Sequence, residues 1–379
     1  MFSPMFGLHL MNMFRIVSAI LFISVTTSEV KAQGDSSPAP LVWKKKHTLE
    51  TPGCLPVSVA YARDGKLLII GGTGGRVVAV DCLTRKEQWK AEVGGDFAAV
   101  AVAADGKSVL TTFDDGVRYL DLNTGTIRNF HIEQGSRPIA VGVFPDLELE
   151  RDMQPSLFAH KILFGNARGW FVKTWTASGF PGTITTTTVP KGDLPADPQA
   201  VPLAVDPAGK RVVLTGPRDT ATGKNVLWAW AAGNPGQENQ ILEGHQAAVV
   251  SAAWSKDGKT LATGDAAGSV ILWDAKSMRP TDHQELGARV AALALSPDGT
   301  KVAAVAIGNR AEYFAWEKGK PKNRKLIHID TARFSGPVHA CLAFAPDGQQ
   351  LVGSAVSLDA TGLAEKTAGH VHLWERGRP

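Results

Sequence analysis

Two segments of the chain carry residue types that could do chemistry. The glycine-rich stretch 70–76 follows an apolar run, as loops that bind phosphate do. His370 and His372 stand two residues apart, so on a strand both imidazoles would point to one side, where they could hold a metal ion. A phosphate loop requires a helix that starts after the glycines, whereas Val77–Val80 has the pattern of a strand. We therefore interpret the glycines as a tight hairpin connection and the histidines as surface or packing residues.

Other patterns of catalysis and metal binding are missing from the sequence. The motifs Gly-x-Ser-x-Gly, Cys-x-x-Cys and His-Glu-x-x-His do not occur. The three cysteines are an odd number, so at least one thiol is free. Cys54 begins one strand and Cys82 ends another that runs to the opposite face, too far away for a disulfide. We expect Cys54, Cys82 and Cys341 to be buried or half-buried thiols, and we predict no catalytic residue, no metal and no cofactor.

The first residues resemble a targeting segment rather than part of a fold. Arg15 precedes the apolar run Ile16–Val25, and Val30-Lys31-Ala32 then offers compact residues at a cleavage position. The apolar run is about ten residues long, short of the ~20 that span a bilayer. This order predicts a signal peptide over residues 1–32 and a periplasmic or extracellular protein, residues 33–379, with no transmembrane span. A retained membrane anchor is the alternative.

Composition indicates a folded protein with no preference for nucleic acid. The chain has 379 residues, of which 44% are hydrophobic and 20% charged, so it can bury a sizeable core. Its 40 Lys and Arg against 36 Asp and Glu give a net charge of +4. These basic residues are dispersed, apart from Lys44–Lys46 and the stretch 318–325. Nucleic-acid binders usually concentrate positive charge on one face, so we expect no nucleic acid as partner.

The rest of the chain repeats one unit of about forty to fifty residues. Each unit has an apolar strand, a turn of the Asp-Gly type, a second apolar strand, a glycine turn and a third strand. The turn glycines fall at positions 65, 106, 209, 258, 299 and 348, and the one long interval holds two units. The missing turn lies near 144–146, before an insertion over 147–160. Seven units of an all-β fold result, with starts near 55, 97, 138, 200, 247, 289 and 337.

The fifth unit carries the motifs of a known family. It contains Gly244-His245, the turn Ser255–Lys259, Thr263 and finally Trp273-Asp274. These residues resemble the WD40 repeat, and the resemblance implies a seven-bladed β-propeller that acts as a non-enzymatic scaffold for protein interactions. In that family a His, a Ser or Thr, a Trp and a turn Asp form one hydrogen-bonded chain. Here the chain would be His245, Thr263 and Trp273 in a structural role, with Ala267 at the position of the turn aspartate, which predicts an incomplete network.

Closure of the propeller involves both ends of the mature chain. The last unit stops after its third strand at Trp374-Glu375, and only four residues follow. Residues 41–50, with Trp43–Glu50 as the strand, precede the first unit and have no other edge to occupy. We predict that this N-terminal strand pairs with the last blade and closes a monomeric ring, since an open ring would leave two unpaired edges.

The first two units suggest a second family. Asp81–Lys90 and Asp121–Gly125 resemble the Asp-x-x-Thr-Gly-x-x-x-Trp pattern of quinoprotein-like propellers, although Arg85 replaces the glycine in one and Phe130 stands near the expected Trp in the other. Some members of that group bind pyrroloquinoline quinone and oxidise alcohols, and others are exported scaffolds for envelope assembly. The alternative function is therefore a quinoprotein-like or hydrolytic enzyme with its site at the central channel.

Two long loops are the candidate contact regions for a partner. They run over Gly216–Lys224 and Ser357–Gly369, and loops of this kind join strands or blades on one rim of a propeller. Their mixed charges suit a protein or peptide whose identity the sequence does not give. The residues predicted to face it are Arg218, Asp219, Lys224, Asp359, Glu365 and Lys366.

Overall fold

The computed structural model describes most of the repeat region. All statements below concern residues 42–95, 98–102, 106–113, 116–132, 142–143, 158–166, 169–177, 183–187, 201–207, 211–218, 225–231, 240–320, 324–330, 338–357 and 369–377. They lie in one compact unit, Pro40–Pro379. These residues form strands and turns only, so the all-β prediction is confirmed. Among them, no helix is long and apolar enough to cross a membrane.

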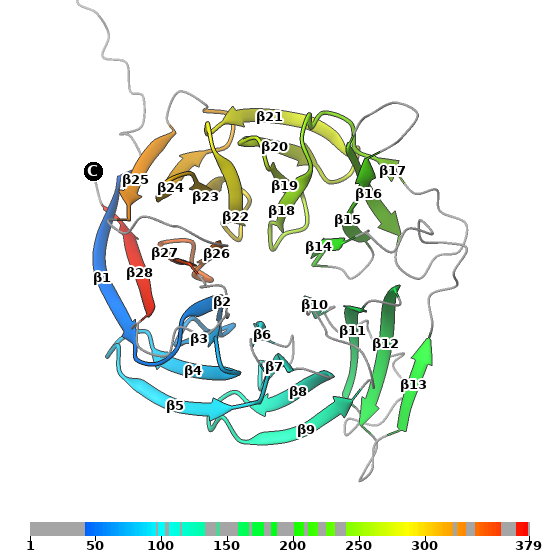
Figure 1. Ribbon diagram of the computed structural model, residues 1–379, viewed down its shortest axis with the longest axis vertical. Coiled ribbons are helices and arrows are strands. Elements are labelled where there is room, and N and C mark those ends of the chain that lie inside the picture. The colour runs from blue at the N-terminus through cyan, green and yellow to red at the C-terminus, as the bar shows by residue number, and fades with distance from the viewer. Residues whose placement is uncertain are drawn as a thin grey trace, which may run out of the picture. The chain divides into compact units, whose positions relative to one another are not determined.

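Seven four-stranded antiparallel sheets are present in the described parts of the chain, and we number them by the order in which their innermost strands occur along the chain (Figure 1). In the first six sheets, the four strands follow one another along the sequence. The first three sheets contain β2 (Pro56–Tyr61), β3 (Leu67–Gly72), β4 (Arg76–Asp81) and β5 (Glu87–Glu92); β6 (Val100–Val102), β7 (Ser108–Phe113), β8 (Gly116–Asp121) and β9 (Ile127–Ile132); and β10 (Gly142–Val143), β11 (Phe158–Asn166), β12 (Gly169–Ala177) and β13 (Thr183–Thr187).

The next three sheets repeat this arrangement. They contain β14 (Val201–Val205), β15 (Arg211–Arg218), β16 (Asn225–Ala231) and β17 (Gln240–Ile241); β18 (Val249–Trp254), β19 (Thr260–Asp265), β20 (Ser269–Asp274) and β21 (Arg279–Glu285); and β22 (Arg289–Leu295), β23 (Lys301–Ile307), β24 (Ala311–Glu317) and β25 (Lys325–Ile329). The insertion expected over 147–160 is shorter than predicted at its end, because β11 already begins at Phe158.

The seventh sheet takes its strands from both ends of the chain. It contains β26 (Val338–Phe344), β27 (Gln350–Ser357) and β28 (Gly369–Arg376), with β1 (Trp43–Thr51) on its outer edge. β1 runs antiparallel to β28, from Trp43 opposite Arg376 to Thr51 opposite Gly369. Figure 1 shows this blue strand beside the red one. Trp43 is buried and its ring packs on Phe344, with 5.8 Å between ring centroids.

The glycines of the repeated Asp-Gly turns have the positive φ that tight turns between strands require. Gly65, Gly258, Gly299 and Gly348 all have φ between 65° and 73°. This left-handed conformation costs a residue with a Cβ about 1–2 kcal/mol, which glycine avoids. In these four sheets, the turns therefore fix where the first strand ends and the second begins.

The apolar core is divided into clusters that lie between neighbouring sheets. One cluster joins Ile69 and Val77 of the first sheet to Val109 and Leu120 of the second. Another joins the first sheet to the seventh, with Leu68, Ile70 and Val80 on one side and Val352, Val371 and Leu373 on the other. The first sheet thus packs against a neighbour on both sides, as expected of repeat proteins.

The innermost strands form an unbroken series of contacts. β2 contacts β6, β6 contacts β10, and the series continues through β14, β18, β22 and β26, which contacts β2 again. A single closed ring of seven blades is the arrangement that this series favours, and the blade number stays a prediction. An experimental structure with six or eight blades would contradict it.

Removing residues 33–50 tests the role of β1. We expect lower stability and self-association, because the deletion bares the outer edge of β28 and the surface under Trp43. The measurements are thermal melting and sedimentation velocity. A deletion of residues 33–41, which leaves β1 intact, is the matched control. A monomeric 33–50 deletion with the melting temperature of the control would refute closure by this strand.

Candidate functional site

The three residues predicted to form the network of the fifth sheet lie together. The indole N–H of Trp273 donates to Thr263 Oγ1 over 2.7 Å, and Thr263 Oγ1 lies 2.7 Å from His245 Nε2. On its other side, His245 Nδ1 lies 2.9 Å from Asp265 Oδ2. All four side chains are buried. The contacts join β19 to β20 and to the segment that precedes β18.

Asp265 corrects the sequence reading, which had put the turn aspartate at Ala267 and so had predicted an incomplete network. β19 extends to Asp265, two residues earlier, and the network is complete. The second carboxylate oxygen of Asp265 accepts hydrogen bonds from the backbone N–H groups of Ala267, Gly268 and Ser269. Asp265 thus holds both the imidazole and the turn that leads into β20.

Electrostatics fix the direction of each hydrogen bond in this network. Burial lowers the pKa of His245 although Asp265 acts in the opposite direction. Burial alone would raise the pKa of Asp265, but hydrogen bonds from His245 and from the backbone N–H of Ser269 bring it below its usual value. His245 is therefore neutral and donates from Nδ1 to the carboxylate, while its Nε2 accepts from the Thr263 hydroxyl. Because the imidazole is enclosed by these partners, we assign it a structural role.

The glycine-rich stretch forms a hairpin, as predicted. β3 ends at Gly72 and β4 begins at Arg76, with Gly74 and Gly75 at φ of 65° and 61° between them. A strand follows these glycines, so the turn lacks the helix N-terminus that a phosphate loop needs.

The three thiols are free, and Cys54 and Cys341 are buried while Cys82 is half-buried, which confirms that prediction. Burial raises the pKa of Cys54 to about 11 and those of Cys82 and Cys341 to about 12. Thiols of this kind stay protonated at neutral pH and are poor nucleophiles.

The predicted partner loops are largely beyond what the structure describes. Asp219, Lys224, Asp359, Glu365 and Lys366 lie outside the described residues, so their contact role stays a prediction. Arg218 is the exception and a correction: it is the last residue of β15 and pairs with Asn225 of β16, so it lies in a strand rather than in a loop.

A groove of about 830 Å³ lies where the seventh sheet meets the first. Its lining comes from β1 on one side and from β4, β5 and the turn between them on the other. Charges of both signs line it, from Glu50, Arg76, Arg85, Glu87 and Lys90. Arg76 is held in place, because its guanidinium donates to the Gly53 carbonyl and lies 3.7 Å from Glu92.

The neighbouring junction, between the first and second sheets, shows why this groove is open. There Trp89 of β5 packs flat on Gly125, and its indole N–H donates to the Leu122 carbonyl over 2.8 Å. A Cβ at position 125 would overlap the Trp89 ring. In this chain, the Trp and Gly of the Asp-x-x-Thr-Gly-x-x-x-Trp pattern therefore contribute to the packing of one sheet on the next.

At the open junction both partners of that contact are replaced. His47 of β1 lies opposite Leu373 of β28, and Trp89 of β5 lies opposite Ala79 of β4. By this strand register, His47 occupies the position that corresponds to Trp89. Arg85 occupies the position of Gly125 in the corresponding turn of the first sheet, which an aspartate also caps. Arg85 has the same left-handed conformation, with φ of 62°. A smaller ring and an exposed arginine thus stand where a tryptophan and a glycine fill the next junction.

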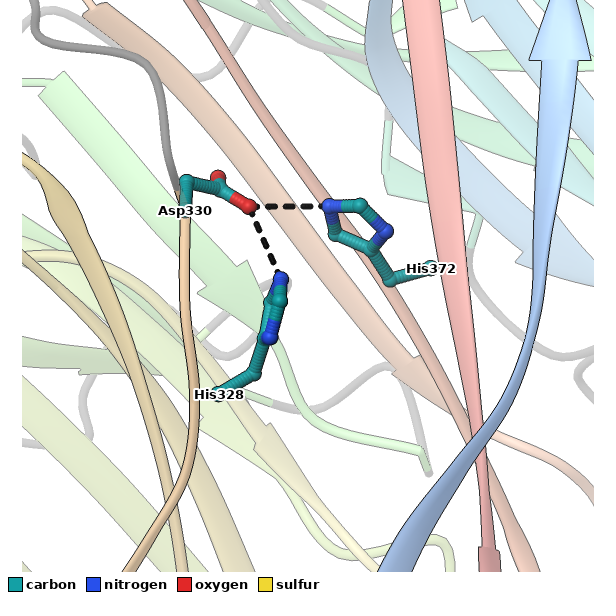
Figure 2. Close-up of side chains that lie close together, drawn as sticks. All are labelled: His328, Asp330 and His372. Atoms are coloured by element: carbon teal, nitrogen blue, oxygen red, sulfur yellow. Dashed lines mark hydrogen bonds and ion pairs between the residues drawn. The ribbon is translucent and has the colours of Figure 1, made fainter.

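His372 lies in a cluster that the sequence did not predict. Its Nε2 lies 2.9 Å from Asp330 Oδ1, and His328 Nε2 lies 3.1 Å from the same oxygen. Figure 2 shows the three side chains pointing toward one another. The predicted neighbour His370 is exposed and takes no part in this cluster. Burial and the charges of Lys45 and His372 lower the pKa of His328, in that order.

Two family models match separate parts of the chain. Residues 236–274, which hold the His245 network, match the WD domain, G-beta repeat. Residues 38–169 match a family described as outer membrane protein assembly factor BamB. No curated protein matches the chain.

Solved structures match over almost the whole chain. The crystal structure of the Myceliophteria thermophila Cps50 (Swd1) beta-propeller domain is 13% identical, has a TM-score of 0.63, and covers 89% of this chain and 100% of that one. A chain in the crystal structure of the mitotic checkpoint complex is 15% identical, with a TM-score of 0.62 and coverage of 95% and 99%. At such identities the likeness concerns the fold alone.

The fold is therefore a β-propeller of four-stranded antiparallel sheets, and the resemblance to WD40 propellers is confirmed. Within this class, the chain combines a WD40 repeat at 236–274 with a BamB-like segment at 38–169.

Replacing Trp273 tests the network of the fifth sheet. Trp273→Ala should lower the free energy of unfolding by about 3–5 kcal/mol, because a fully buried aromatic ring is lost. Trp273→Phe keeps a buried six-membered ring and removes the five-membered ring with its N–H, so we expect a smaller loss of about 1–3 kcal/mol. Urea unfolding followed by circular dichroism measures both. Equal midpoints for Trp273→Ala and the wild type would show that the assignment of this network is wrong.

The pH dependence of stability tests the neutral state of His245. Since the folded-state pKa of His245 lies below its value of ~6.5 in the unfolded chain, its stabilisation is present above pH ~6.5 and is lost as pH falls through the folded value. Urea midpoints between pH 7 and 5 should therefore fall less steeply in His245→Gln than in the wild type. Parallel slopes would contradict a neutral imidazole in the folded state.

Proposed function

We propose that this protein is an exported, non-enzymatic scaffold that binds a protein or peptide partner in the groove between β1 and β4–β5. The leader-like residues 1–32 and the match of residues 38–169 to an outer membrane assembly factor support export. The propeller fold supports a binding role, and one similar structure is itself part of a complex.

The observation that carries this proposal is the missing contact at the junction of the seventh and first sheets. Trp89 on Gly125 closes the equivalent position one junction further along. His47 and Arg85 leave it open, and the open space is the groove of about 830 Å³. All residues that line it fall within the segment 38–169 that matches the assembly factor.

Arg85 adds a physical reason to expect a ligand. An arginine with φ of 62° is strained by about 1 kcal/mol relative to a glycine, and nothing in the turn requires the side chain. Strained residues cluster at sites where the side chain serves function. Together with Lys90 and Glu87, Arg85 gives the groove a charge pattern suited to a peptide that carries both signs.

The alternative function is a quinoprotein-like or hydrolytic enzyme, and the match of residues 38–169 is the observation in its favour. The two candidates differ in a direct measurement. Addition of pyrroloquinoline quinone and Ca²⁺ to the purified protein, followed by an alcohol-oxidation assay, would favour the enzyme if turnover appeared.

Filling the groove with a copy of the Trp89–Gly125 contact tests whether the groove is the binding site for the partner. His47→Trp with Arg85→Gly copies the Trp89–Gly125 contact into the groove, so we expect binding of the partner to fall by at least about tenfold. The unfolding free energy should stay equal or rise by up to about 1 kcal/mol, because a buried ring and an unstrained turn are gained. The partner is first identified by cross-linking to the wild type in native envelopes, and its Kd is then measured with purified protein.

Arg279→Glu is the control for this test, since Arg279 is an exposed cation after the corresponding turn of the fifth sheet. It should leave the Kd unchanged. A stable His47→Trp/Arg85→Gly protein that binds the partner as well as the wild type would rule out the groove as the contact site.

A further inference from the structure

The cluster of His328, Asp330 and His372 joins two sheets. His328 lies on β25 of the sixth sheet, Asp330 follows that strand directly, and His372 lies on β28 of the seventh. Their donor atoms, two Nε2 and one carboxylate oxygen, all lie within 4.8 Å of one another. Side-chain exposures of 19%, 11% and 11% leave the cluster in reach of solvent ions.

The sixth sheet has polar residues, Asp330 and Tyr313, at two positions where the first and fifth sheets have aliphatic ones. Asp330 corresponds to Val93 and Leu286, which follow the outer strands β5 and β21, and all three backbone N–H groups make the same hydrogen bond to the start of the preceding strand. Val93 and Leu286 are buried. Tyr313, which donates to Asp330 Oδ2 over 3.0 Å, stands at the strand position of Val270. Burying these polar groups costs free energy that an aliphatic set would not, so packing does not explain them.

The hydrogen bonds of the cluster conflict at one nitrogen. His328 Nε2 lies 3.1 Å from Asp330 Oδ1, an acceptor, and 3.3 Å from Lys45 Nζ, a donor. One imidazole nitrogen cannot donate and accept at once, so protons alone satisfy only one of these contacts. A bound cation would use the lone pairs of both imidazoles and of the carboxylate, so that no proton is needed between them, and Lys45 would then have to move away from His328.

We propose that His328 Nε2, Asp330 Oδ1 and His372 Nε2 form a binding site for a divalent first-row transition metal ion, with Zn²⁺ as the reference ion. Two imidazoles and one carboxylate are a ligand set suited to Zn²⁺ and its neighbours, whereas Mg²⁺ and Ca²⁺ prefer oxygen ligands. Metal bonds of about 2.0–2.1 Å at tetrahedral angles separate ligand atoms by about 3.3 Å. The separations of 2.9 and 3.1 Å therefore need a small expansion, and the two Nε2 atoms, which lie within 4.8 Å of each other, need to move closer together.

Contacts around the three ligands orient them for this role. Tyr313 holds the other carboxylate oxygen of Asp330, so that Oδ1 faces the two imidazoles. His372 Nδ1 lies 3.3 Å from Thr48 Oγ1, which can accept a hydrogen bond from the Nδ1–H group and so keep the Nε2 lone pair free to bind the ion. Lys45 approaches the site from β1 and competes with the ion by charge repulsion. A bound ion would cross-link the sixth sheet to the sheet that β1 closes.

Titration of the purified full chain with ZnCl₂, after treatment with a chelator, tests this site by calorimetry. We expect one ion per chain and a higher melting temperature in its presence. His328→Gln and His372→Gln should weaken binding by at least about 100-fold. Lys45→Met should strengthen it about five- to tenfold, because a nearby positive charge is removed. With Co²⁺ in place of Zn²⁺, the wild type should show visible d–d absorption that His372→Gln lacks.

His283→Gln is the matched control, because His283 pairs with Glu285 on an outer strand without a third ligand. It should bind Zn²⁺ like the wild type. Lys45→Met keeps the test decisive even if a ligand variant fails to fold, since a purely hydrogen-bonded cluster would gain no metal affinity from it. Failure of the wild type to bind Zn²⁺, binding that survives His328→Gln and His372→Gln, or no gain in Lys45→Met would overturn the proposal.

Discussion

Pairing of β1 with β28 is the interaction on which the rest of the architecture depends. The first sheet shares apolar clusters with the second and with the seventh, so its packing depends on a neighbour on both sides. The seventh sheet can take its place only when residues from the two ends of the chain form one edge. The groove, the metal-site candidate and the cluster around Trp43 all include β1 or contact it.

Buried hydrogen bonds contribute unevenly to the individual sheets. The fifth sheet has the complete network around Thr263, whereas the indole N–H groups of Trp316 and Trp374 are buried without an acceptor. The register explains the difference, because Ala304 and Gly353 stand at the positions that correspond to Thr263 and have no hydroxyl. The sixth and seventh sheets therefore rely on ring and aliphatic packing, with about 1–3 kcal/mol lost at each unpaired group.

Local signals in the sequence predicted the strands and turns, but the sequence did not predict contacts between residues of different sheets. Asp-Gly turns and apolar runs are local, so they located Gly65, Gly258 and the strands around them. The turn aspartate was placed two residues late because a family pattern fixes spacing less strictly than hydrogen bonding does. His372 was paired with His370, its neighbour along the strand, whereas its partners come from another sheet.

The groove could not be predicted from the sequence either, because it also depends on residues of two different sheets. The sequence shows Arg85 as a departure from a repeated glycine. Its role in the groove depends on His47, whose strand β1 belongs to the seventh sheet and not to the first. Only the strand register shows that these two residues together replace one tryptophan–glycine contact. A single-sequence pattern compares units with one another and does not show which side chains meet at a junction between them.

The position of β1 also imposes a delay during synthesis. β1 leaves the ribosome first, but its partner β28 is almost the last segment to be made, so at about 5–20 residues per second the strand waits about 20–60 seconds. An unpaired strand of this length invites pairing with other chains. Lys44, Lys45 and Lys46 are exposed near its start, and their charges oppose such pairing. The same lysine row that borders the finished ring thus protects the nascent chain until the ring can close.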